Sequence, residues 1–234
     1  MDYTKYVKIE KEIDNNYALA SNKGYKFKIR KNKIDAFTCK EVFGCGYFKH
    51  LELDKNDVVI DVGANIGVFA IAAADKCREV IAFEPDPANY RLAQENIKLN
   101  KIKNIRLIHG AVAEHDGDIE LYLNSGVCSD CHSTVKIRGR KSIKVKAISL
   151  NDIISRYNPN KLKIDCEGEE LKFMRTANMN NIRNLAMEVH FTYSKRDKHV
   201  NYYKCKSNIE KYFNKIKYPK VQDKFSKMMF AKKI

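Results

Sequence analysis

The sequence predicts an α/β fold in which a mostly parallel central sheet is covered by helices on both faces. From residue 58 onward, short apolar runs rich in β-branched residues alternate with longer segments of helical spacing. Several runs are continuously apolar, as strands buried on both faces are. A glycine-containing turn closes the first run. Strands and helices that alternate in this way build right-handed βαβ units and therefore a parallel sheet.

The individual elements follow from the periodicity along the chain. Residues 17–21 and 25–31 alternate like half-exposed strands, whereas residues 39–53 fit either a helix or a loop. Pro87 lies near the first turn of a predicted helix, where proline is tolerated. The other predicted strands are 58–64, 80–85, 105–112, 119–124, 143–148, 161–168, 185–190 and 228–231, and the predicted helices are 66–76, 87–100, 150–157, 169–177 and 208–214. Residues 1–57 form an N-terminal extension of the same domain, and residues 58–234 form its main part.

Length and composition limit the class of protein. A chain of 234 residues with 44% hydrophobic residues can form one domain with a sizeable core. It has no apolar run near the roughly 18 residues that a membrane span requires, and its first residues lack the apolar stretch of a secretion signal. Seven cysteines, an odd number, favour reduced thiols over a disulfide framework. We therefore expect a cytoplasmic protein without a membrane span.

Positive charge is concentrated at the C-terminal end. The formal net charge is +15, and residues 195–234 contribute +10 of it, from 13 Lys and Arg against 3 Asp and Glu. Such a segment can bind nucleic acid, an anionic glycan or an acidic surface, but a solvated lysine-rich face has the same pattern. Aromatic residues interleave with the lysines and could stack on bases or sugars: Tyr193, Tyr202, Tyr203, Tyr212, Phe213 and Tyr218. The four-residue spacing of Ile209 and Phe213 indicates instead a buried helix stripe.

The turn after the first apolar strand is a candidate cofactor loop. It reads Asp61-Val-Gly63-Ala-Asn65-Ile-Gly67 and opens a helix whose free N–H groups can receive an anionic ligand group. In sheets of this kind, ligands bind at the carboxyl ends of the strands. Dinucleotide sites prefer the spacing G-x-G-x-x-G, which is broken here. Asp61 instead suits a ligand with an ammonium group, such as the methionine part of S-adenosylmethionine.

A carboxylate follows the next strand at the expected place. Glu84 stands 17 residues after Gly67, at the tip of the strand. A carboxylate there can accept hydrogen bonds from both hydroxyls of a ribose. Enzymes that use NAD have the same device, so Glu84 alone does not distinguish the two cofactors.

These motifs resemble those of the FkbM-type methyltransferases. The similar stretches are VVIDVGANIGVFAIAAA, IAFEPDPANYRLAQENIKLN, LKIDCEGEELKFM and LAMEVH. The resemblance implies a Rossmann-like class I methyltransferase fold with S-adenosylmethionine as the methyl donor, and a hydroxyl group, often on a sugar or natural product, as the acceptor. It places Asp61, Gly63, Asn65 and Gly67 on the methionine side of the cofactor, Glu84 at the ribose and Ala111 beside the adenine.

Two carboxylates at the end of a later strand are candidate catalytic groups. Asp165 and Glu167 are two residues apart, so both point to one face of an extended strand. Either could take the proton that a hydroxyl loses during methyl transfer. Glu188 and His190 form a neighbouring pair, and the ordinary pKa of histidine suits a base near neutral pH. We predict Asp165, Glu167 and His190 as catalytic residues.

Other roles compete with these assignments. Glu167 could cap the following helix, and a histidine at a strand end is often a hydrogen-bonded structural residue. Asp165, Glu167 and Glu188 could supply oxygen ligands to Mg²⁺, although we assign no metal ligand from the sequence.

A zinc site is a weaker possibility. Cys128, Cys131 and His132 have the spacing of a half-site, and Cys39 with Cys45 could complete it. The irregular spacing of the second pair and its distance along the chain favour ordinary thiols.

The leading functional hypothesis is an enzyme that methylates a hydroxyl of a glycan, a metabolite or a modified biopolymer. The alternative is an RNA methyltransferase, favoured by the basic segment 195–234 and by residues 96–100, which resemble a segment of tRNA-modifying relatives of this fold. Methylation of exocyclic base amines is disfavoured because residues 157–160 (YNPN) precede a strand instead of following it. A non-catalytic binding module would not need the glycine loop, and an NAD enzyme would have to bind pyrophosphate without the usual glycine spacing.

Overall fold

The structure is a computed structural model of the chain and describes residues 7–31, 34–44, 47–124, 132–136, 139–190, 195–217 and 226–234. Its strands are β1 (Lys8–Glu12), β2 (Tyr17–Asn22), β3 (Tyr25–Arg30), β4 (Val58–Val62), β5 (Glu79–Glu84), β6 (Ile105–His109), β7 (Ala111–Ala113), β8 (Gly117–Tyr122), β9 (Ser142–Ser149), β10 (Lys161–Ile164), β11 (Asn184–His190), β12 (Lys215–Lys217) and β13 (Ser226–Lys232). Its helices are α1 (Asp35–Gly44), α2 (Tyr47–Leu51), α3 (Val68–Ala74), α4 (Pro87–Leu99), α5 (Leu150–Tyr157), α6 (Glu170–Phe173) and α7 (Lys195–Tyr212).

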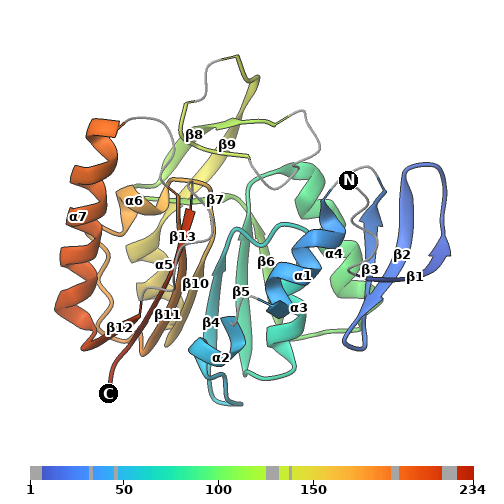
Figure 1. The fold of residues 1–234 in the computed structure, drawn as a ribbon, viewed down its shortest axis with the longest axis horizontal. Coiled ribbons are helices and arrows are strands. Elements are labelled where there is room, and N and C mark those ends of the chain that lie inside the picture. Colours follow the sequence, from blue (N-terminus) through green and yellow to red (C-terminus); the bar gives the residue numbers. More distant parts are fainter. Residues whose placement is uncertain are drawn as a thin grey trace.

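A seven-stranded sheet forms the centre of the described structure (Figure 1), with the strand order β12-β13-β11-β10-β4-β5-β6. β4 pairs in parallel with β5 on one side and with β10 on the other. β6 and β11 continue this parallel arrangement, whereas β13 pairs antiparallel with both β11 and β12. The strand order therefore reverses beside β4, where a ligand crevice is expected at the carboxyl ends. The predicted α/β fold with a mostly parallel sheet is confirmed.

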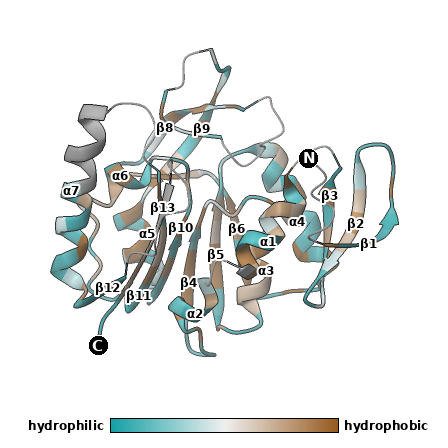
Figure 2. Ribbon diagram, viewed as in Figure 1, coloured by the Kyte–Doolittle hydropathy of each residue, from teal (hydrophilic) through white to brown (hydrophobic). Residues whose placement is uncertain are grey.

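Helices cover both faces of this sheet, and each face has its own apolar core. Val58, Ile60 and Val62 of β4 pack with α5, α6 and α7, whereas Val59 packs with α1, α3 and α4. This division follows from the alternation of side chains along a strand. Figure 1 shows the two groups of helices on opposite sides of the sheet, and in Figure 2 the central strands are largely brown, the colour of hydrophobic residues.

Gly110 divides the predicted strand 105–112 into β6 and β7. β7 leaves the main sheet and joins β9 and β8 in a three-stranded sheet, which lies above the carboxyl edge of the main sheet in Figure 1. A Cβ atom at Gly110 would lie 3.2 Å from the carbonyl oxygen of Lys146, so the two backbones approach closely there. The prediction of one continuous strand was wrong because apolar periodicity does not reveal a change of sheet.

The N-terminal extension packs against the α3 face of the main sheet. β1, β2 and β3 form an antiparallel sheet whose apolar residues belong to the same core as α3 and α4. Asn96 of α4 joins three segments: its Oδ1 accepts the N–H of Lys28 at 2.7 Å, and its Nδ2 donates to the carbonyl of Ile66 at 2.9 Å. One buried side chain therefore connects the extension to the loop after β4. The boundary at residue 57 stays a prediction.

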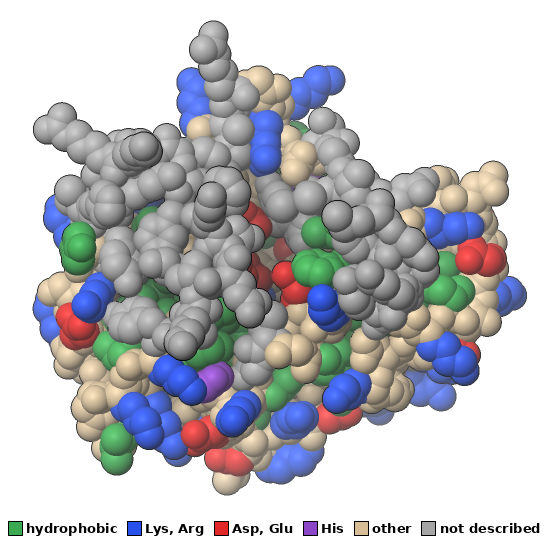
Figure 3. All heavy atoms as spheres, in the orientation of Figure 1, with side chains coloured by type: hydrophobic (Ala, Val, Ile, Leu, Met, Phe, Trp, Pro, Cys, Tyr) green, Lys and Arg blue, Asp and Glu red, His purple; other side chains and the backbone are tan. Residues whose placement is uncertain are grey.

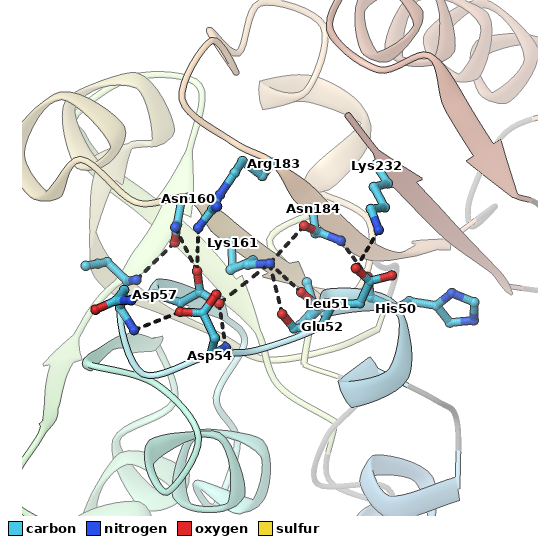
Figure 4. A network of polar contacts seen from close by, with 12 residues as sticks. His50, Leu51, Glu52, Asp54, Asp57, Asn160, Lys161, Arg183, Asn184 and Lys232 are labelled. Carbon is cyan, nitrogen blue, oxygen red and sulfur yellow. Dashed lines mark hydrogen bonds and ion pairs between the residues drawn. The ribbon is translucent and has the colours of Figure 1, made fainter. Parts of the chain in front are cut away.

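A buried ionic network fixes the amino ends of β4 and β10 (Figure 4). Asp57 is fully buried and accepts hydrogen bonds of 2.8 Å from Arg183 Nη2 and from Asn160 Nδ2. Lys161 Nζ lies 3.5 Å from Asp57 Oδ2 and donates to the carbonyl of Leu51 at 2.8 Å. The network thus joins the extension to the sheet at the edge opposite the expected crevice.

Some elements differ from the sequence prediction. The open segment 39–53 is largely helical and contributes to α1 and to α2. β1 and β12 were not predicted because they are short and mostly exposed, without a clear apolar pattern. α7 begins well before the predicted start at residue 208 because its first half is polar in sequence. Within the described part of the chain, no helix is both long and apolar enough to cross a membrane.

Candidate active site

A cavity of about 480 Å³ lies at the carboxyl ends of the central strands. Its wall includes the residues that follow β4, β5 and β10, together with Glu188 of β11. Helix α1 and Tyr47 of α2 contribute another side, and Leu121 of β8 lines the cavity from the small sheet. Acidic side chains are visible inside a hollow of the face shown in Figure 3. The position agrees with the crevice expected where the strand order reverses.

The loop after β4 passes very close to the end of β10. Gly63 has a φ of 80°, and a Cβ atom there would lie 1.8 Å from the carbonyl oxygen of Asp165. Asn65 and Gly67 also have positive φ values, 51° and 87°. Gly63 and Asn65 line the cavity, whereas Gly67 lies behind them at the start of α3. The buried Oδ1 of Asn65 has no hydrogen-bond partner within the described ranges, so it is available to a ligand.

Asp61 lies beneath this loop and does not line the cavity. It is fully buried, and its Oδ1 is 3.0 Å from Lys163 Nζ, which also donates a 2.9 Å hydrogen bond to the carbonyl of Gly63. Burial raises the pKa of Asp61, although Lys163 lowers it in part. Burial alone would lower the pKa of Lys163, but Asp61 and Asp165 raise it overall. The cation beside Asp61 is thus a lysine of the chain. Neither carboxylate oxygen of Asp61 has a hydrogen-bond partner by geometry among the described residues, and its contact with a ligand ammonium stays a prediction.

Glu84 lies at the end of β5 and lines the cavity. Its Oε2 accepts the N–H of Asn65 at 2.7 Å, and its Oε1 accepts the N–H of Asp86 at 2.9 Å. Burial raises the pKa of Glu84 to about 7, although these two N–H groups act to lower it. Ala111, the first residue of β7, lies on the same wall. The cavity therefore holds a buried carboxylate, an unpartnered amide oxygen and a small apolar residue side by side with the glycine loop.

Asp165, Glu167 and Glu188 line the cavity and surround one nitrogen of His190. His190 Nε2 is 3.9 Å from Asp165 Oδ1 and 3.6 Å from Glu167 Oε1. The same nitrogen is 3.8 Å from Glu188 Oε1. β10 and β11 pair in parallel with Ile164 opposite Met187, so the residues that follow these positions meet at one edge. The structure brings the predicted catalytic residues together.

Glu170, the first residue of α6, holds the other side of the His190 ring. Its Oε1 accepts hydrogen bonds from the backbone N–H of His190 at 2.7 Å and from Nδ1 at 3.2 Å. Burial alone would lower the pKa of His190, but Glu170, followed by Glu167 and Asp165, raises it well above its ordinary value. The neighbouring carboxylates thus favour the protonated ring, and the role of His190 as a base stays a prediction.

Sequence reasoning missed two residues of this region, Lys163 and Glu170. Lys163 stands in a strand whose four residues are all buried, where a charge requires a partner, and it pairs in register with Asp61. That combination was a usable signal. Glu170, not Glu167, accepts the N–H of Gly168 before α6, at 2.8 Å. Three of the four residues from Glu167 to Glu170 are acidic, and the sequence does not indicate which one is buried.

The zinc hypothesis falls partly outside the described residues, which do not include Cys45, Cys128 or Cys131. Cys39 is buried in the apolar core, where burial raises the pKa of its thiol to about 12. His132 lines the cavity, and its Nδ1 accepts the N–H of Asn124 at 2.8 Å. Cys39 is thus a core residue and His132 a residue of the cavity wall.

The C-terminal aromatic residues divide into two groups. Ile209 and Phe213 are buried in the core beneath α7, which confirms the predicted helix stripe. Tyr203 is 61% exposed, and Tyr212 packs against the edge of the core. Tyr193, Tyr218 and the side chain of Tyr202 lie outside the described part of the structure.

The strand order, the crossover beside β4 and the glycine loop together define a Rossmann-like class I methyltransferase fold. TYW2 from M. jannaschii, solved in complex with AdoMet, has a similar fold, with a TM-score of 0.54 and 17% identity over 95% of this chain and 89% of that one. The chain matches the methyltransferase FkbM domain over residues 61–220, and it belongs to that family. The family that the sequence resemblance indicated is thereby confirmed.

Two curated relatives are also methyltransferases. The hexuronic acid methyltransferase AglP of Haloferax volcanii is 29% identical over 144 residues, 59% of this chain and 58% of that protein. The methyltransferase sdnD of Sordaria araneosa is 24% identical over 196 residues, 67% of this chain and 76% of that protein. The chain thus matches little more than half of the length of the archaeal relative.

Proposed function

We propose that the chain transfers the methyl group of S-adenosylmethionine to a hydroxyl oxygen of a sugar-containing acceptor. The observation that carries this proposal is the group of three carboxylates, Asp165, Glu167 and Glu188, in the cavity wall beside the cofactor loop. A hydroxyl loses its proton as it takes up a methyl group, and a carboxylate within hydrogen-bond reach can accept that proton. The relative AglP, named a hexuronic acid methyltransferase, supports a sugar as the acceptor.

The polar atoms of the cavity fit the methyl donor. Each oxygen of Glu84 accepts one backbone N–H and keeps a lone pair, so the carboxylate can bind the two ribose hydroxyls. The Oδ1 of Asn65 can accept a hydrogen bond from the ammonium group, and Ala111 leaves room for the adenine. Asp61 and Gly67 do not line the cavity, and we assign them the support of the loop on the methionine side of the donor. The bound donor supplies a methyl carbon activated by a positively charged sulfur.

Asp165 is the first candidate for the proton acceptor. Its backbone carbonyl lies against Gly63, so its side chain begins directly beside the cofactor loop. Glu167 is the second candidate, on the same wall. Glu170 holds the Nδ1 side of His190, and we assign His190 the positioning of the carboxylates around its Nε2. The acceptor hydroxyl is then held between the donor and Asp165, in line with the methyl group.

Isotope transfer tests the proposal. The chain is incubated with donor labelled in the methyl group and with separate pools of oligosaccharides, RNA and protein. We expect label in the sugar pool, in a linkage that mass spectrometry assigns to oxygen. Asp165→Asn should lower kcat by about 100-fold or more while S-adenosylhomocysteine still binds, whereas the surface substitution Asp118→Asn should leave kcat unchanged. Label only in RNA, or full activity of Asp165→Asn, would contradict the proposal.

The RNA pool tests the alternative hypothesis of an RNA methyltransferase, which is not better supported than the sugar acceptor. The two asparagines of the segment 96–100 both have structural partners. Asn96 binds the backbone of Lys28, and Asn100 binds the N–H and the carbonyl of Lys26 at 2.9 and 2.7 Å. These contacts account for both residues without a nucleic acid.

A further inference from the structure

The imidazole of His190 is aimed into a ring of carboxylates by a buried support. It is 6% exposed, and Glu170 holds its Nδ1 side through the ring nitrogen and the backbone N–H. Its Nε2 points toward Asp165, Glu167 and Glu188 but makes no hydrogen bond to them, because the separations are 3.6 to 3.9 Å. A histidine whose Nδ1 is bound by a carboxylate while its Nε2 faces other ligands has the arrangement found at metal sites.

The separations fit a shared ion. The ligand atoms of Asp165, Glu188 and His190 all lie within 4.8 Å of one another. Ligands about 2.1 to 2.2 Å from a six-coordinate ion are about 3 Å apart when adjacent and about 4.3 Å apart when opposite. The observed distances from Nε2 to the carboxylate oxygens lie between these two values. Small side-chain movements would bring the three groups onto one ion.

We propose that Asp165, Glu188 and His190 bind one divalent cation at the acceptor end of the cavity, with Glu170 as the residue that positions His190. The mixed oxygen and nitrogen ligands suit a transition-metal ion such as Mn²⁺, because Mg²⁺ and Ca²⁺ prefer oxygen alone. The proton on Nε2 leaves when the ion binds. Asp165 and Glu188 both line the cavity, so the ion has open positions toward the acceptor.

The chemical role of the cation rests on the proposed function, the methylation of a hydroxyl group. An acceptor hydroxyl bound to the ion has a lowered pKa, as water has on a bound metal. Asp165 then acts as a ligand, and Glu167, whose Oε1 is 3.6 Å from His190 Nε2, is the remaining carboxylate that can take the hydroxyl proton. Binding of the ion itself does not depend on any acceptor, so it can be tested alone.

Titration with Mn²⁺ tests the site. Binding is measured as the loss of the electron paramagnetic resonance signal of the free ion. We expect one Mn²⁺ per chain, with affinity reduced about tenfold or more in Asp165→Asn, Glu188→Gln and Glu170→Gln. Glu95→Gln, at a surface ion pair with Lys28, is the matched control and should bind like the wild type. A nitrogen hyperfine coupling on the bound Mn²⁺ should be present in the wild type and absent in His190→Gln.

Binding of S-adenosylhomocysteine, measured by calorimetry on each variant, reports whether the cavity is still folded. Absence of Mn²⁺ binding to the wild type, or equal Mn²⁺ binding by the Asp165, Glu188 and control variants, would overturn the inference while leaving the methyltransferase function intact. Bound Mn²⁺ without nitrogen coupling would exclude His190 as a ligand and overturn it as well. Conversely, a chain that binds Mn²⁺ as expected but transfers no label to sugars would refute the proposed function alone.

Discussion

Gly63 is the residue on which the shape of the cofactor loop depends most directly. Gly63→Ala places a Cβ atom 1.8 Å from the carbonyl oxygen of Asp165, on a backbone with a φ of 80°. The positive φ alone costs about 1–2 kcal/mol for an alanine, and the collision forces β4 and β10 apart in addition. We expect a lower Tm and at least a tenfold weaker binding of S-adenosylhomocysteine, measured by thermal unfolding and calorimetry.

Gly24→Ala is the matched control for that substitution. Gly24 has a φ of 89°, but a Cβ atom there meets nothing within 4 Å. It should lose stability through its backbone conformation alone and bind S-adenosylhomocysteine like the wild type. Equal effects of the two substitutions on cofactor binding would show that the contact between Gly63 and Asp165 does not matter.

We expect Glu84, as the proposed ligand of the ribose, to make the affinity for the cofactor depend on pH. Its pKa is raised to about 7 by burial, so the free protein carries a neutral carboxyl below that pH and a carboxylate above it. Two ribose hydroxyls donate best to the carboxylate. Affinity for S-adenosylhomocysteine should therefore rise toward about pH 8 and fall by up to about tenfold per unit below pH 7. Calorimetry at several pH values checks this, and Glu84→Gln should bind weakly with a flatter profile.

For single residues of the site, the sequence predicted those whose position follows from motif spacing. It missed the properties that depend on partners brought close by folding. Gly63, Asn65 and Glu84 stand at strand ends with the expected offsets, and all three line the cavity. The lysine beside Asp61 was not predicted because Lys163 comes from a strand about 100 residues later in the chain. The raised pKa of His190 was invisible for the same reason, since Glu170 is brought to it by folding.

The packing of the amino ends of β4 and β10 is stabilised by the ion pairs and hydrogen bonds of Asp57. Asp57→Asn keeps the shape of the side chain but removes the charge that faces the buried Lys161 and the exposed Arg183. Leaving a buried cation without its partner costs about 3 kcal/mol. We expect that loss in the free energy of unfolding, measured by urea denaturation, with no change in the affinity for S-adenosylhomocysteine because the cavity lies at the opposite edge of the sheet.

Asp118→Asn is the corresponding control on the small sheet. Asp118 pairs with Lys146 at 2.7 Å, and both side chains are largely exposed. Solvent screens such a pair, so unfolding should be unchanged. If Asp57→Asn were equally neutral, the network in Figure 4 would not hold the extension to the sheet.

Strands were predicted well where a run of apolar residues marks a buried strand. The prediction failed where the chain passes from one sheet to another or where a helix has few apolar residues. β4, β5, β10 and β11 were predicted near their observed positions because they are buried apolar runs. Gly110 ends β6 and redirects the chain into the small sheet, which requires knowledge of the backbone of β9. α7 is stabilised through residues such as Cys205 and Ile209 in its second half, so its polar first half escaped a search for apolar spacing.

Across the whole molecule, acidic and basic side chains lie in different regions: carboxylates line the cavity, and exposed lysines lie on α7. The chain carries a net charge of +15, yet the described acceptor end of the cavity is lined by Asp165, Glu167 and Glu188. Lys204 and Lys211 of α7 are exposed. An RNA acceptor would need its phosphates bound by such lysines and would meet acidic groups at the cavity. A small sugar acceptor would enter the cavity without contacting the lysines, so the two acceptor classes can be distinguished by experiment.

We therefore expect the double variant Lys204→Glu/Lys211→Glu to methylate the sugar acceptor with a kcat/KM within about twofold of the wild type. For both proteins, raising salt from about 50 to about 200 mM should change kcat/KM by less than about threefold, because a small sugar carries few charges. A nucleic acid bound through several phosphates would instead lose about 10³-fold or more in affinity over that range. Steep salt dependence together with loss of activity in the double variant would contradict this expectation. It would indicate that α7 binds RNA and that the acceptor is a nucleic acid, because only a polyanion contacts many lysines at once.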